Sequence, residues 1–120
     1  MPYGFSEQEW SAAVAEMTAI LQQRAKLRAM ITYGDLANEM QIVRIGYHDP
    51  AMNNMLLDVS MNEHARGCGL LSVIVVHKYG DMEPGGGFYG LAASLGLDVS
   101  DRTACWIREL HRVHDYWSNP

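Results

Sequence analysis

Apolar side chains first recur at helical spacing near the start of the chain. Ser6 stands just ahead of this stripe and Glu9 follows three residues later, which is the order of a capping box. The stripe consists of Trp10, Val14, Met17 and Leu21. The pattern predicts a helix over residues 7–29. Three cations complement the dipole at its end, which we favour over a nucleic-acid patch: Arg24, Lys26 and Arg28.

Two further helix starts follow, each marked by a capping residue. Thr32 precedes a short predicted helix over residues 33–40, with Asp35 in its first turn. Asp49 then supplies an N-cap and is followed by a proline at the first helical position, which predicts a helix over residues 50–66.

The second half of the chain opens with a continuous aliphatic run. Residues 70–76 are rich in β-branched side chains and are bounded by glycines, which favours a buried strand. A glycine-rich loop is expected over residues 80–87, followed by a short helix over residues 88–95. Ser100 and Asp101 begin a last helix, whose apolar stripe is Trp106, Leu110, Val113 and Trp117.

The order of these elements predicts the fold class. A short helix, a turn, a second helix and a strand follow one another as in a helix-turn-helix with a wing. We therefore expect an α+β fold, mainly helical, with a winged-helix-like core between N- and C-terminal helices. Three-helix folds that do not bind DNA share this order and are the alternative. With 120 residues, the chain is expected to form a single domain over residues 1–120.

The charge of the chain narrows the classes of partner. A formal net charge of −5 opposes the general attraction to phosphates that supplies most non-specific affinity for DNA, although a local basic patch can still bind it. No apolar run approaches the ~20 residues of a membrane span, and the first residues do not resemble a signal peptide. Cys68 and Cys105 are too few for a disulfide framework. We expect a cytoplasmic protein with reduced cysteines and no membrane partner.

Residues 31–97 contain three segments that resemble one family. The segment MITYGDLANEM resembles the Thr/Ser-Tyr-Gly-x-Leu-Ala motif that opens the DNA-binding domain of the O6-alkylguanine-DNA alkyltransferases and the alkyltransferase-like proteins. VVHKY stands where that family has Pro-Cys-His-Arg-Val, and PGGGFYGLAASLG stands where it has a Tyr-Ser-Gly-Gly loop entering a helix. The resemblance implies a winged-helix architecture and a duplex-binding mode.

Departures from the family pattern decide the chemistry. Val76 occupies the position of the reactive cysteine, and valine has no nucleophile, so alkyl transfer at that site is excluded. The proline and the arginine of the same motif are also replaced, and the predicted helix over residues 50–66 has no identifiable intercalating arginine. The resemblance therefore implies binding rather than repair, and we do not expect an enzyme.

Under the DNA-binding hypothesis, five residues carry the interface: Tyr33, Arg44, Asn53, Asn54 and Lys78. The tyrosine would approach a phosphate, as the resemblance implies. The two asparagines face outward from the predicted helix and can read adenine through paired hydrogen bonds. The arginine precedes that helix and the lysine lies on the expected wing, where each can contact the DNA backbone.

His77 and Asp81 are weak catalytic candidates. A histidine after a strand can act as a general base when a carboxylate orients it, and Asp81 follows four residues later. A histidine that caps the strand with a hydrogen bond to the loop is the favoured interpretation.

Two ligand patterns are incomplete. A dinucleotide-binding spacing is formed by Gly85, Gly87 and Gly90, but no βαβ unit surrounds it. A metal could be held by His111 and His114, beside Asp115, but no third ligand is evident. We expect no cofactor and no metal.

Two functions therefore stay open. The first is a small non-enzymatic DNA-binding protein of winged-helix type, whose partner is duplex DNA. The second is an acidic protein-interaction module, an accessory or inhibitory factor that binds a partner protein and no nucleic acid. The order of the motifs favours the first and the charge favours the second, and a homo-oligomer is compatible with both.

Overall fold

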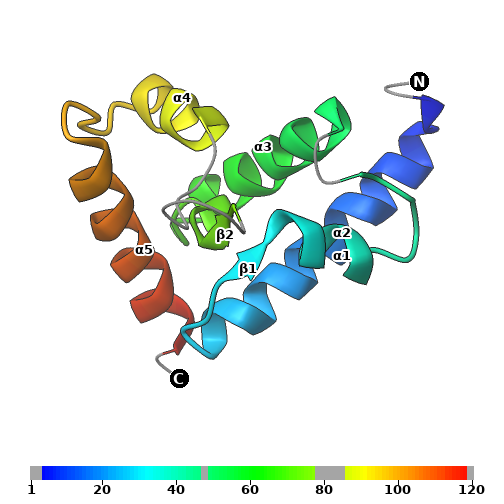
Figure 1. Cartoon of the computed structure of the whole chain (residues 1–120), viewed down its shortest axis with the longest axis horizontal. Helices are drawn as coiled ribbons and strands as arrows, with labels where there is room; N and C mark the ends of the chain where they lie inside the picture. Colours follow the sequence, from blue (N-terminus) through cyan, green and yellow to red (C-terminus); the bar gives the residue numbers. More distant parts are fainter. Residues whose placement is uncertain (1–3, 47–48, 78–85, 119–120) are drawn as a thin grey trace.

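Helices carry most of the chain in the structure, a computed structural model that describes residues 4–46, 49–77 and 86–118 (Figure 1). Within these residues the α-helices are α1 (Glu7–Lys26), α2 (Tyr33–Glu39), α3 (Pro50–Ala65), α4 (Gly86–Ser94) and α5 (Arg102–Ser118). A radius of gyration of 13.5 Å agrees with the value of about 13.6 Å expected for a compact chain of this length.

Local capping chemistry sets the start of three helices. Ser6 and Glu9 form the predicted capping box of α1, with N···O distances of 2.9 and 3.1 Å. Thr32 Oγ1 accepts a hydrogen bond from the amide of Asp35 at 3.1 Å, and Asp49 accepts one from the amide of Ala51 at 3.0 Å. The predicted starts of α1, α2 and α3 are therefore confirmed.

The end of α1 differs from the prediction. The helix stops at Lys26 instead of residue 29, because Arg28 adopts the left-handed conformation with φ 53°. Its guanidinium bonds Asp115 of α5 at 2.8 Å, and Arg24 pairs with Glu39 of α2. Two members of the basic cluster therefore connect helices and do not form a free cationic patch.

The predicted strand over residues 70–76 is mostly wrong. Leu71–Ile74 form a short 3-10 helix, η2, and only Val75–Val76 form a strand, β2. This strand pairs in parallel with β1 (Ile31–Thr32), with Ile31 opposite Val75. One backbone amide of η2, that of Ser72, donates its hydrogen bond to a side chain of another helix, Ser60 Oγ of α3, at 2.9 Å.

A mainly helical α+β fold is thus confirmed, with a sheet of two short parallel strands in the described part of the chain. The predicted glycine-rich loop is wrong at Gly86 and Gly87, which belong to α4. The other residues of that loop, and those of the expected wing that follow His77, lie outside the described residues.

The core lies where α1, α3 and α5 pack around η2. Every side chain of η2 is buried, as are Met17 and Leu21 of α1. On α5, Val113 of the predicted stripe is fully buried. Glu109 of the same helix is 3% exposed and accepts a hydrogen bond from the amide of Leu70 at 3.0 Å.

No helix in the described part of the chain is both long enough and apolar enough to cross a membrane.

Candidate functional site

The parallel strand pair brings Tyr33 and His77 together. Thr32 and Val76 are register partners, so the residues that follow them leave the ladder side by side. The two rings lie with their centroids 4.9 Å apart and their planes inclined by 31°. Tyr33 is 8% exposed, whereas His77 is exposed to solvent. The buried phenol ring therefore supports an exposed imidazole.

A hollow of about 1130 Å³ opens beside this ring pair. Its described lining comes from Thr32 of β1, from α2, from the segment that follows α2, and from His77. The polar and charged side chains that line it, besides the ring pair, are Thr32, Asp35, Asn38, Gln41 and Arg44. The hollow therefore combines an aromatic surface with one guanidinium, one carboxylate and two amides.

The segment that carries Arg44 is held by α1. The carboxylate of Glu16 accepts hydrogen bonds from the amides of Gln41 and Ile42, at distances of 3.0 to 3.1 Å. Arg44 itself is exposed, and no carboxylate among the described residues lies within ion-pairing distance of it. In the part of the chain that the structure describes, its guanidinium therefore faces solvent without an ion pair.

The structure unites only part of the predicted interface. Tyr33 and Arg44 line the hollow together. Asn53 and Asn54 are exposed on α3 and are not part of the described lining. The side-chain amide of Asn54 donates back to the carbonyl of Pro50 at 3.0 Å. Lys78, the fifth predicted residue, lies outside the described residues.

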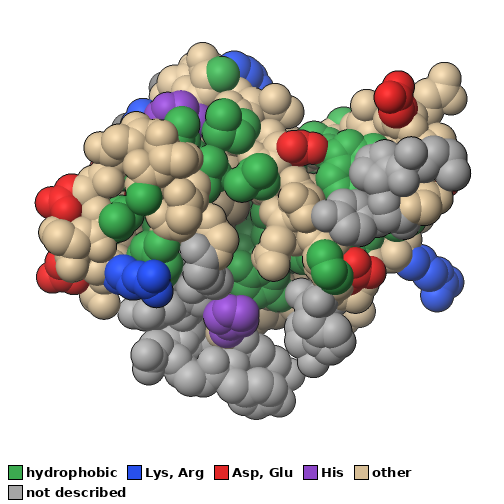
Figure 2. Space-filling model, turned by 90° about the horizontal axis from the view of Figure 1, so that it is seen from above, with side chains coloured by type: hydrophobic (Ala, Val, Ile, Leu, Met, Phe, Trp, Pro, Cys, Tyr) green, Lys and Arg blue, Asp and Glu red, His purple; other side chains and the backbone are tan. Residues whose placement is uncertain are grey.

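The outward face of α3 also carries apolar side chains. Leu57 and Met61 are 41% and 43% exposed and follow the two asparagines at helical spacing. Seen from above, the molecule shows hydrophobic side chains near the middle of the view and Lys and Arg side chains nearer its margins (Figure 2). The exposure of Leu57 and Met61 was not predicted from the sequence, although Leu57 is an apolar residue among the polar residues of that helix face.

The weak catalytic pair is only half described. His77 contacts the Tyr33 ring, and Asp81 lies outside the described residues, as does Gly85 of the dinucleotide spacing. Gly87 and Gly90 lie within α4, so they are not part of a loop.

The histidines of α5 do not converge with Asp115. His114 is buried and its Nε2 lies 2.9 Å from the carbonyl oxygen of Ala29, whereas His111 is exposed and Asp115 pairs with Arg28. Across residues 4–46, 49–77 and 86–118, no group of three His, Cys, Asp or Glu side chains is placed to hold a metal ion.

Comparisons with family models, with curated proteins and with solved structures found no match.

Val76 is fully buried in β2. The nearest chemistry-bearing side chain along the chain is thus His77, which faces solvent. The two cysteines are both buried and unpaired, and burial raises the pKa of the Cys105 thiol. None of these groups supplies an activated nucleophile at the hollow.

Proposed function

We propose that this chain is a non-enzymatic DNA-binding protein of winged-helix type that contacts duplex DNA through α2, α3 and the segment between them. The observation that carries the proposal is the exposed guanidinium of Arg44, which has no carboxylate partner among the described residues and shares a hollow with the Tyr33–His77 ring pair. An exposed cation of this kind beside a polar hollow allows a chain with a net negative charge to hold a phosphate locally.

Each part of the interface has a distinct role under this proposal. Arg44 neutralises a backbone phosphate, and the ring pair packs against the sugar-phosphate backbone or a base. Asn53 reads a base edge from the exposed face of α3. The carboxylate of Asp35 lines the same hollow and repels phosphate, so it lowers the affinity of this site for DNA.

A salt series tests the proposal directly. Binding to a fluorescein-labelled random 30-mer duplex is measured by anisotropy between low and moderate salt. Affinity should fall steeply with salt, and Arg44→Ala should weaken binding and reduce the slope of log K against log salt by about 1. Lys26→Ala removes an exposed cation at the end of α1 and is the matched control, which should bind as the parent does.

Asp35→Asn provides the opposite change. Removal of this negative charge from the hollow should raise DNA affinity severalfold, while Thr32 still caps the helix through the Asp35 amide. Absence of binding even at low salt, for the parent and for Asp35→Asn alike, would remove the DNA-binding proposal.

A protein-interaction module is the second candidate, and one observation favours it. Leu57 and Met61 expose apolar surface on α3 where a duplex-binding helix would present cations. The net charge of −5 agrees with a protein partner better than with DNA. Under this candidate, Leu57→Ser would abolish capture of the partner, whereas Arg44→Ala would not.

A further inference from the structure

A second hollow of about 510 Å³ lies in the groove between α1 and α3. Trp10 and Val14 line it from α1, and Asp58, Met61, Glu63 and Arg66 line it from α3 and its C-terminal cap. We call this the α1–α3 groove. It is separate from the hollow that contains His77, and the two share no lining residue in the described part of the chain.

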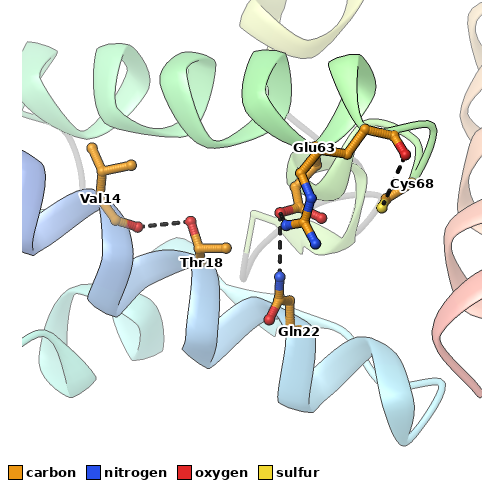
Figure 3. Close-up of polar contacts among 6 residues, drawn as sticks. Val14, Thr18, Gln22, Glu63 and Cys68 are labelled. Atoms are coloured by element: carbon orange, nitrogen blue, oxygen red, sulfur yellow. Dashed lines mark hydrogen bonds and ion pairs between the residues drawn. The ribbon is translucent and has the colours of Figure 1, made fainter.

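The groove contains a buried carboxylate with an unsatisfied oxygen. Glu63 is 1% exposed, and its Oε1 accepts hydrogen bonds from Gln22 Nε2 at 3.2 Å and Arg66 Nη1 at 3.1 Å (Figure 3). Its Oε2 is also buried and has no hydrogen-bond partner among the described residues. A carboxylate oxygen buried in this way costs stability unless a donor reaches it.

The neighbouring donor on α1 is already engaged. Thr18 Oγ1 donates to the carbonyl of Val14 at 2.7 Å, so its hydrogen is directed along α1 and not toward Glu63 (Figure 3). Arg66 reaches only one of the two carboxylate oxygens, and its side chain is 63% exposed. The Arg66 guanidinium therefore bonds one oxygen of Glu63 from the solvent side, and a competing cation can take its place.

The rest of the groove suits an elongated cationic side chain. Asp58 supplies a second carboxylate, whose Oδ2 accepts a hydrogen bond from Trp10 Nε1 at 2.7 Å. Val14 and Met61 provide an apolar wall along which an aliphatic stem can lie. An arginine has the required shape, since its planar fork bonds both oxygens of a carboxylate.

We propose that the α1–α3 groove is a docking site for an arginine side chain of a partner protein, and that Arg66 occupies the site in the free chain. The incoming guanidinium displaces that of Arg66 and bonds both oxygens of Glu63. This proposal rests on the buried carboxylate and is independent of DNA binding.

The probe is an acetylated Gly-Arg-Gly amide, titrated into the ¹⁵N-labelled full chain and followed by NMR. The Trp10 Nε1–H and Gln22 side-chain amide signals should shift together and saturate. The matched peptide with citrulline in place of arginine keeps the shape and loses the charge, so it should leave them in place.

Three variants and one control sharpen the test. Arg66→Ala removes the internal competitor and should tighten binding about three- to tenfold, as expected when a competing state is removed. Glu63→Gln and Asp58→Asn should each weaken it, and Glu7→Gln, a charge-matched change at an exposed position of α1, should not. If Glu63→Gln fails to fold, the affinities of Arg66→Ala and Asp58→Asn for the arginine peptide test the proposal.

Three results would overturn the proposal. The first is equal shifts with the citrulline peptide, and the second is unchanged affinity in Arg66→Ala. The third is that duplex DNA, and not the peptide, moves the Trp10 and Gln22 signals. Loss of DNA binding in Arg44→Ala has no bearing on these outcomes, so the two proposals fail separately.

Discussion

Gly69 is the position at which one added methyl group should be most informative. It has φ +87°, in the left-handed region, and it follows α3 where the chain passes close to α5. A Cβ at this position would lie 2.9 Å from Val113 Cγ2 and 3.1 Å from Glu109 Oε1. The first of these contacts is too short for two carbon atoms, so Gly69→Ala forces the Val113 side chain or the backbone around it to move.

The cost of this change has two parts. An alanine in the left-handed region costs about 1–2 kcal/mol, and overpacking against a core side chain adds about 1–3 kcal/mol. Gly67 is the matched control, because it has φ +79° and a Cβ there meets nothing within 4 Å. Gly67→Ala should therefore lose only the first part, about 1–2 kcal/mol.

Urea unfolding separates the two variants. With an m-value of about 2 kcal/mol per M, an additional loss of about 2 kcal/mol lowers the midpoint of Gly69→Ala by about 1 M relative to Gly67→Ala. Adding Val113→Ala removes the clashing methyl, so a double-mutant cycle should show a favourable coupling of about 0.5–3 kcal/mol. Equal midpoints for the two alanine variants would refute the close approach of Gly69 to α5.

Three further predictions concern single groups. The hydrogen bonds from Ser6 lower the pKa of Glu9 from its ordinary 4.5. The stability of the parent relative to Glu9→Gln, measured by urea unfolding, should therefore be greatest at neutral pH and fall as the pH drops through 4.5 and below. Burial raises the pKa of Cys105, so iodoacetamide should alkylate it slowly in the native chain and quickly in urea, as read by mass spectrometry; equal rates would contradict its burial. Gly34 lines the hollow with Arg44 and has open space where a Cβ would lie. Gly34→Ala should therefore raise the urea midpoint, because alanine favours the helix, and weaken DNA binding, because the added methyl group enters the hollow. Unchanged binding would place the duplex elsewhere.

Helix starts could be predicted from the sequence because capping is local. Ser6, Thr32 and Asp49 each bond a backbone amide within a few residues, so the sequence contains both partners. The 3-10 segment, by contrast, depends on distant partners. The amide of Ser72 is satisfied by Ser60 Oγ of α3, and the carbonyl of Val73 by Trp106 of α5, which no local pattern indicates.

The candidate sites were less predictable than the helices. Tyr33 and Arg44 were candidates from the sequence, but the position of Tyr33 beside His77 follows from the parallel register, which is a tertiary property. Glu63 was missed because a glutamate in a helix is usually exposed. Its spacing from Val59 does place it on the buried face of α3, and that spacing is the signal that could have found it.

The segment between α2 and α3 divides both proposed sites. Before it lie Tyr33 of the hollow and Trp10 of the α1–α3 groove; after it lie His77 and Glu63. A chain cut after Gly46 would therefore leave each site incomplete on either fragment, with His77 of the hollow and Glu63 of the groove on the second one. Complementation of the two fragments would restore both sites at once, so recovery of arginine-peptide binding would report reassembly of the whole fold.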